Sequence, residues 1–162
     1  MLGSNETFKI ADDIEVSQAL VVINDWRQNL TDRFVGMVTG IDGDSKRWLV
    51  RTKGQVKEYT TVWFSLEQRS LQVESQLMPA PEEDVERCYE FLLRKNSKLV
   101  GLHLSIGMEN AIYLVGSFPV VSLSGELLDE ILGTAWTYSE EIFSTAMAIG
   151  FKSKYKYRGT KA

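Results

Sequence analysis

The chain has 162 residues, of which 44% are hydrophobic and 25% are charged, and its formal net charge is -4. This length and composition predict one globular domain with a single core. No apolar run approaches the roughly 20 residues that span a bilayer, no basic and apolar leader follows Met1, and a single cysteine excludes an internal disulfide, so we expect a cytoplasmic protein without a membrane segment.

The charge is unevenly distributed, because the end of the chain is basic and carries no acid. We expect a domain over residues 1–150 and a tail over residues 151–162. Such a tail can attract a nucleic-acid backbone, whereas a solvated and frayed terminus needs no partner. We favour the frayed terminus and do not expect nucleic acid as a partner. The bases of the tail are Lys152, Lys154, Lys156, Arg158 and Lys161.

The first expected helix spans residues 13–30. Asp12 and Glu15 have the spacing of a capping box, and apolar residues then recur at helical intervals. Residues 33–41 stay open, because their apolar spacing suits a helix while their glycines and β-branched residues disfavour one. A turn is expected at 42–45.

Three strands are expected next, and their short connections force antiparallel neighbours. In the middle strand Val62 lies on one face, whereas Tyr59 and Trp63 lie on the other. Both faces are therefore partly apolar, so the second face needs a covering layer, a subunit partner or a ligand. The three expected strands are 46–52, 56–66 and 70–78.

The second half of the chain contains two further helices and a hairpin. Pro81 is expected as the first residue of the second helix, and Asn96 as its left-handed cap. A hairpin turns around residues 107–110, and Ser124 then caps a long last helix that ends at Gly150. The expected hairpin strands are 99–106 and 111–118.

The resulting order of elements is α-β-β-β-α-β-β-α. It predicts an α+β fold in which three helices pack against an antiparallel sheet of about five strands. At about 1.5 Å per residue, the last helix is long enough to cross a small sheet. We expect it to cover the core.

Four runs of the sequence carry a family resemblance: TVWFSLEQRSLQVESQLMPAPEE at 61–83, VERCYEFLLRKN at 85–96, AIYLVGSFP at 111–119 and LDEILGTAWTYSEEIFSTAMAIGF at 128–151. They resemble the YbjN family of bacterial proteins, which are labelled sensory-transduction regulators. The resemblance covers about the last two thirds of the chain and is clearest over residues 46–151. It implies a fold like that of the type III secretion chaperones, small homodimers that hold a partner polypeptide partly extended. It supplies no catalytic residue.

The sequence offers little for catalysis or for metal binding. His103 is the single histidine, and no G-x-S-x-G nucleophile elbow is present. One histidine and one cysteine leave the usual zinc ligand sets unfilled. Cys88 lies on the apolar stripe of the second helix, where a free thiol acts as a small hydrophobe. We therefore expect no catalytic residue, no metal site and no cofactor.

The aromatic residues Trp48, Tyr59 and Trp63 are the stronger candidates for a functional surface. They either fill a second core layer or form an exposed contact for a subunit or an extended peptide. In the second case Arg47 and Arg51 can receive acidic side chains of a partner.

These observations predict a non-enzymatic, homodimeric protein that binds an as yet unidentified polypeptide. Two other classes of function stay open. One is a regulator that binds nucleic acid through the basic tail. The other is a small-molecule sensor, which requires a closed apolar pocket under the last helix.

Overall fold

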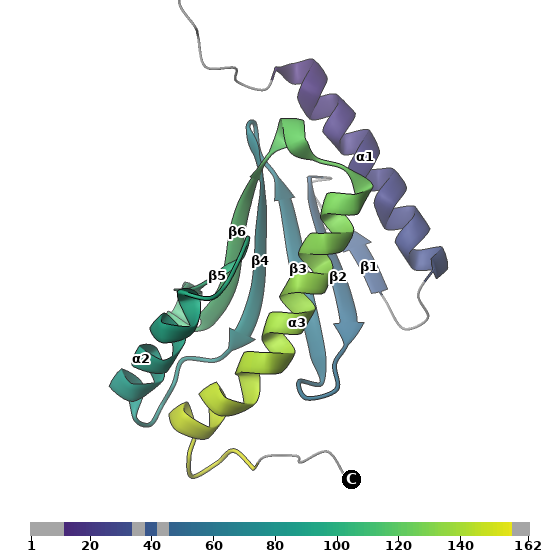
Figure 1. Ribbon diagram of the computed structural model, residues 1–162. Coiled ribbons are helices and arrows are strands. Elements are labelled where there is room, and N and C mark those ends of the chain that lie inside the picture. The colour runs from purple at the N-terminus through teal and green to yellow at the C-terminus, as the bar shows by residue number, and fades with distance from the viewer. Residues whose placement is uncertain (1–11, 34–37, 42–45, 157–162) are drawn as a thin grey trace, which may run out of the picture.

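The computed structural model describes residues 12–33, 38–41 and 46–156, and in this part of the chain three α-helices pack on a single sheet (Figure 1). The α+β class and the order of its elements are confirmed. In chain order the elements are α1 Asp13–Arg33, β1 Val38–Ile41, β2 Arg47–Lys53, β3 Tyr59–Leu66, β4 Ser70–Met78, α2 Val85–Asn96, β5 His103–Ile106, η1 Met108–Asn110, β6 Ile112–Pro119, η2 Val120–Ser122 and α3 Gly125–Gly150.

The sheet is antiparallel throughout, and its strand order is β1-β2-β3-β4-β6-β5. All five expected strands are present. A sixth strand, β1, comes from the segment that the sequence left open, because Val38–Ile41 completes a ladder with β2 at the sheet edge. The turn expected at 42–45 lies outside the described residues.

Side-chain caps begin two of the helices as expected. The Asp12 backbone N–H donates to Glu15 Oε2 at 3.0 Å, and the Glu15 N–H donates to Asp12 Oδ1 at 2.8 Å. This reciprocal pair is the capping box expected from the sequence. At the start of α3, Ser124 Oγ accepts a hydrogen bond from the Leu127 N–H at 3.1 Å. Both caps satisfy N–H groups that a first helical turn leaves without partners.

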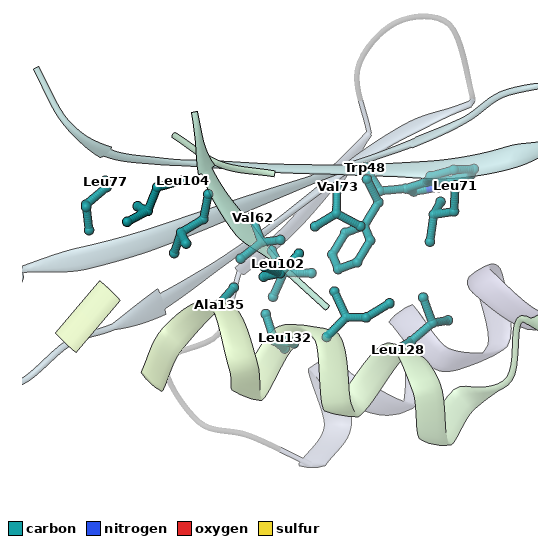
Figure 2. Packing of buried hydrophobic residues seen from close by; sticks show 14 of the residues in the cluster. Trp48, Val62, Leu71, Val73, Leu77, Leu102, Leu104, Leu128, Leu132 and Ala135 are labelled. Atoms are coloured by element: carbon teal, nitrogen blue, oxygen red, sulfur yellow. The ribbon is translucent and has the colours of Figure 1, made fainter. Parts of the chain in front are cut away.

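The core fills the space between α3 and the sheet. Figure 1 shows α3 crossing the sheet in front of β3 and β4, with α1 beside the β1 edge and α2 beside β5. Figure 2 shows Leu128, Leu132 and Ala135 of α3 facing Val62 of β3 and Val73 of β4, all of them buried. Packed side chains therefore occupy the place where a small-molecule sensor would need a closed pocket.

The start of the second helix differs from the expectation, because α2 begins at Val85 and not at Pro81. The backbone N–H groups of Glu82 and Glu83 both donate to the Gly150 carbonyl at 2.9 Å. Pro81 is buried in the same contact with the end of α3. A tertiary contact therefore satisfies these N–H groups, and the helix starts only after them.

Asn96 is also not the left-handed cap that the sequence predicted, because its φ is not positive. Its side-chain amide instead donates to the Leu104 carbonyl at 3.0 Å and accepts from the Leu104 N–H at 2.6 Å. Leu104 belongs to β5, the edge strand of the sheet. Asn96 thus occupies the position that a neighbouring strand would take at Leu104.

Two strands are shorter than expected, one because of a contact with α3 and the other because of a local glycine conformation. β3 begins at Tyr59 and not at 56, because the N–H groups of residues 55–57 donate to Glu140 of α3. β5 begins at His103, since Gly101 adopts a left-handed conformation with a φ of 77° just before it.

Candidate binding surface on the open face of the sheet

The helices cover one face of the sheet, and in the described part of the chain the opposite face carries no helix. The register places a row of five side chains across this open face, one from each of five strands. In spatial order the row is Leu49, Trp63, Glu74, Val115 and His103. The open face is therefore partly apolar, as the alternation in β3 predicted, and it also carries charged groups such as Glu74.

The open face is hollowed by a depression of about 810 Å³. This hollow extends from β2 across the sheet to β6 and β5, and it reaches Phe143 on α3 beside the β2–β3 turn. Its size is that of a typical ligand site, although it opens broadly to solvent. Aromatic and thioether side chains that line it are Tyr59, Trp63, Met78, Met108, Tyr113 and Phe143.

Trp63 lies in the middle of this face and is held there by a charged neighbour. The Arg47 guanidinium carbon lies 4.2 Å from the centroid of the Trp63 ring, a cation–π contact. Arg47 Nη2 also donates to Glu74 Oε1 at 2.9 Å, and the two side chains are 39% and 45% exposed. Such exposed pairs contribute little stability, but this one holds the Arg47 guanidinium over the half-buried indole ring.

Tyr59 is the most exposed aromatic residue of the described sheet, with 47% of its surface accessible. The Arg51 guanidinium carbon lies 5.8 Å from the centroid of its ring. Arg51 Nε donates to Thr61 Oγ1 at 3.0 Å, which directs the guanidinium along the open face. Arg51 forms no ion pair in the described structure, so its charge is available to a partner.

Lys57 adds a third cation at the end of the hollow. Its Nζ donates to the Gln76 carbonyl and lies 5.9 Å from the centroid of the Phe143 ring. Burial lowers the pKa of Lys57 to about 8, and the negative charge of Glu140 acts in the opposite direction. The cation is therefore only partly solvated.

The structure separates the aromatic residues that the sequence grouped together. Trp48 pairs with Phe64, faces the helices and is 1% exposed, so it belongs to the core and is left out of the candidate surface. Sequence reasoning missed Glu74 and Tyr113, which line the hollow. Alternation along 70–78 and 111–118 separates the two faces of each strand, but only the pairing register assigns both residues to the face of Trp63.

The beginning of the basic tail is packed against the domain. Lys154 Nζ bonds to Glu82, and Ser153 Oγ donates to Glu83 Oε1 at 2.6 Å. This hydrogen bond lowers the pKa of Glu83. The Tyr155 ring meets Phe143 edge-on at 5.9 Å. The tail through Tyr155 is therefore not frayed as the sequence suggested. Lys152 and Lys156 are exposed, and Arg158 lies outside the described residues.

A second apolar surface lies along α2 and β5. A depression of about 420 Å³ between them is lined by Leu93 and Ile106 among others, and these two side chains are 68% and 53% exposed. Val100 and Met108, from the segments that flank β5, are 77% and 79% exposed. Several exposed apolar side chains gathered in one patch mark a contact site with another molecule more often than a surface without a partner.

The single histidine and the single cysteine lie apart from each other. His103 is exposed on the open face, and Cys88 is buried against α3 with its Sγ 3.7 Å from the Ala146 carbonyl oxygen. Burial raises the pKa of the Cys88 thiol, which suits a packing role. The described residues contain no group of His, Cys, Asp and Glu side chains able to hold a metal ion.

Comparison with known proteins places this arrangement in a family. Residues 27–146 match the YbjN model, described as "Putative bacterial sensory transduction regulator". The chain belongs to the YbjN family. The match begins at residue 27, well before the region in which the sequence resemblance is clearest.

Relatives of this family member occur in mycobacteria. An uncharacterised protein of Mycobacterium leprae is 29% identical over 115 residues, which is 71% of this chain and 62% of the relative. An uncharacterised protein of Mycobacterium tuberculosis is 29% identical over 105 residues, which is 65% of this chain and 57% of the relative. The chain thus spans less than two thirds of the length of these relatives.

The fold is similar to that of a secretion chaperone. The Yersinia pestis type III secretion chaperone SycH, solved in complex with a stable fragment of YscM2, superimposes with a TM-score of 0.50. The match covers 76% of this chain and 98% of SycH at 14% identity. The chaperone-like fold expected from the resemblance is confirmed.

The helices of the described residues were also compared with the requirements of a bilayer. None of them combines the length and the apolar character needed to cross it.

Proposed function

We propose that this YbjN-family protein is a non-enzymatic, homodimeric module that binds another polypeptide, with a chaperone-like or regulatory role. One observation carries the proposal: the open face of the sheet displays Tyr59 and Trp63 in a hollow of about 810 Å³. Tyr59 is exposed and Trp63 is half-buried, and aromatic side chains flanked by arginine are typical of the centres of protein interfaces. The family description and the solved chaperone complex support the same class of function.

A polypeptide fits the open face better than nucleic acid does. The hollow mixes cations with Glu74 and with apolar side chains, whereas a phosphate backbone needs a continuous basic track. The tail offers no such track in the described residues, because Lys154 is paired with Glu82. A nucleic-acid regulator therefore remains the second candidate.

The α2–β5 surface is the proposed contact of the homodimer. Leu93 and Ile106 expose apolar area on it, and a symmetric contact would bury the same patch on both subunits. Asn96 occupies the strand edge at Leu104, so the contact would form through side chains and not through strand pairing.

Affinity capture tests the polypeptide-binding proposal. The intact protein, a Trp63→Ala variant and a Val21→Ala control, at an exposed site on α1, would each be used to capture proteins from the native cells. We expect partners that Val21→Ala retains and Trp63→Ala loses, with circular dichroism showing that both variants fold. An identical set of captured proteins for all three would contradict binding through the open face.

Sedimentation at micromolar concentration tests the homodimer. We expect a dimer for the intact protein and a monomer for the double variant Leu93→Glu, Ile106→Glu, because charges in an apolar contact are left without partners. Val21 is 60% exposed on α1, so Val21→Glu is the matched control and should stay dimeric. A monomeric intact protein would refute the dimer.

The absence of catalysis and a cytoplasmic location are part of the same proposal. The single cysteine is buried and unpaired, which suits a reducing compartment. Steady turnover of a substrate panel that vanished in a His103→Ala variant would refute the non-enzymatic role.

A further inference from the structure

The outward side of β2 has an alternating chemical pattern. Arg47, Leu49 and Arg51 all lie on the open face, since successive side chains of a strand point to opposite faces. Leu49 lies opposite Trp63 on β3. Along this strip the order is therefore cation, apolar group, cation, with one residue between successive members.

The charge of the hollow is also one-sided. Among the described residues that line it, Arg47, Arg51 and Lys57 are cationic, and Glu74 alone is acidic. The chain as a whole has the opposite sign, with a net charge of -4. A basic hollow on an acidic protein selects for an anionic partner and speeds its encounter.

The three cations differ in what already holds them. Arg47 is bonded to Glu74 and Lys57 interacts with the charge of Glu140, whereas Arg51 bonds only to the neutral oxygen of Thr61 in the described structure. A cation without a carboxylate partner, such as Arg51, gains from a charge-assisted hydrogen bond. The hollow can therefore bind carboxylates of a partner.

We propose that the open face recognises an extended, acidic polypeptide segment in which carboxylates flank an apolar side chain at alternate positions. The apolar side chain would lie on Leu49 and Trp63, and the carboxylates would reach Arg47 and Arg51. Alternate residues of an extended chain share one side, so their spacing matches the strip. This inference rests on the proposed polypeptide-binding function and specifies the chemistry of its partner.

Glu74 limits the affinity for such a segment. It competes for Arg47 and repels an incoming carboxylate at the same place. Removal of its charge should therefore strengthen the binding of an acidic peptide. A variant that fails to fold cannot bind the peptide more tightly, so a folding defect cannot account for this result.

An NMR titration of the full chain tests the inference. The acidic probe is the peptide Ser-Glu-Ser-Leu-Ser-Glu-Ser, and its controls are the same peptide with Gln for Glu and the same peptide with Ser for Leu. The indole N–H signal of Trp63 reports the binding. We expect the acidic probe to bind about tenfold more tightly than the Gln control.

Substitutions then test which charged side chains of the protein affect the binding of the peptide. Arg51→Gln should weaken the binding of the acidic probe about tenfold and leave the affinity for the Gln control peptide unchanged. Glu74→Gln should strengthen the binding of the acidic probe about threefold. Arg94 is an exposed arginine on α2, paired with Glu90, so Arg94→Gln is the matched control and should change nothing.

Three results would overturn the inference. Equal binding of the acidic probe and the Gln control would exclude recognition of carboxylates while leaving a polypeptide surface intact. Tighter binding of single-stranded oligothymidylate than of the acidic probe would favour nucleic acid. No shift of the Trp63 signal with any peptide would exclude this partner chemistry, and Trp63-dependent capture would then still support the proposed function separately.

Discussion

Glu140 on α3 and Val56 in the β2–β3 turn are joined by a hydrogen bond of 2.6 Å, although they lie 84 positions apart in the chain. The same carboxylate accepts from the N–H groups of Gln55 at 2.9 Å and Lys57 at 3.2 Å. One side chain thus satisfies three successive backbone donors of the turn. One helical turn earlier, Trp136 Nε1 donates to the Lys53 carbonyl at 3.2 Å. These contacts hold the β2–β3 turn, at the end of the hollow, against α3.

Glu140→Ala should lower the free energy of unfolding by about 1–3 kcal/mol, because backbone donors of the turn lose a charged acceptor. Urea denaturation measures the change. Glu141, the next residue, is exposed, so Glu141→Ala should stay within about 0.5 kcal/mol. Equal effects of the two substitutions would show that the turn does not depend on Glu140.

Two glycines should respond to alanine in opposite directions. A Cβ at Gly54 would lie 1.8 Å from the Lys57 carbonyl oxygen and 2.4 Å from Glu140 Oε1, so the turn would have to move. A Cβ at exposed Gly133 on α3 would meet nothing within 4 Å. We expect Gly54→Ala to cost about 2 kcal/mol or more, and Gly133→Ala to stabilise by about 0.5–1 kcal/mol. Thermal and urea unfolding report both changes.

Stability should depend on pH through Lys57. Burial lowers its pKa in the folded protein from 10.5 to about 8, and Glu140 opposes this shift. Between these values the unfolded chain binds the proton and the folded chain does not, so stability rises with pH across this window. Relative to Lys57→Met, the intact protein should therefore gain stability as the pH rises from about 8 towards 10.5. A flat difference between the two would contradict the shift.

Asn96 should protect the β5 edge. Asn96→Ala removes both hydrogen bonds to Leu104 and should destabilise the protein by about 1–2 kcal/mol. Asn96→Asp keeps an acceptor for the Leu104 N–H but loses the donor to its carbonyl, so its effect should be intermediate. Ser97→Ala, at an exposed site beside it, is the control. Hydrogen exchange at the Leu104 amide should accelerate in Asn96→Ala, and unchanged exchange would exclude the capping role.

Sequence and structure agree most closely where the structure depends on neighbours in the chain. The caps at Asp12 and Ser124, the end of α3 at Gly150 and the whole of β4 lie where local patterns predicted them. A cap needs one side chain three residues from the N–H that it satisfies, and antiparallel pairing follows from short connections. Such features are readable without knowledge of the fold.

Apart from the start of β5, which a local glycine conformation sets, the disagreements involve contacts between distant segments. Pro81 packs on the end of α3, Asn96 bonds to a strand, and β1 forms because β2 offers it a ladder. Trp48 was grouped with Trp63, but the register of the β2–β3 hairpin places it opposite Phe64 in the core. A shift of one residue moves a side chain to the other face of a sheet, so only the pairing itself could decide this.

The fold class, the order of the elements and the apolar groups on both faces of the middle strand can be predicted from the residues, because periodicity and caps are local properties. Which aromatic side chains line the open face, and which cations lie beside them, depends on the folded arrangement. Tyr59, Trp63, Arg51 and Lys57 share one hollow only after the strands pair and α3 fastens the turn between them. Burial and charge depend on what the rest of the chain brings close, and this proximity cannot be read from spacing.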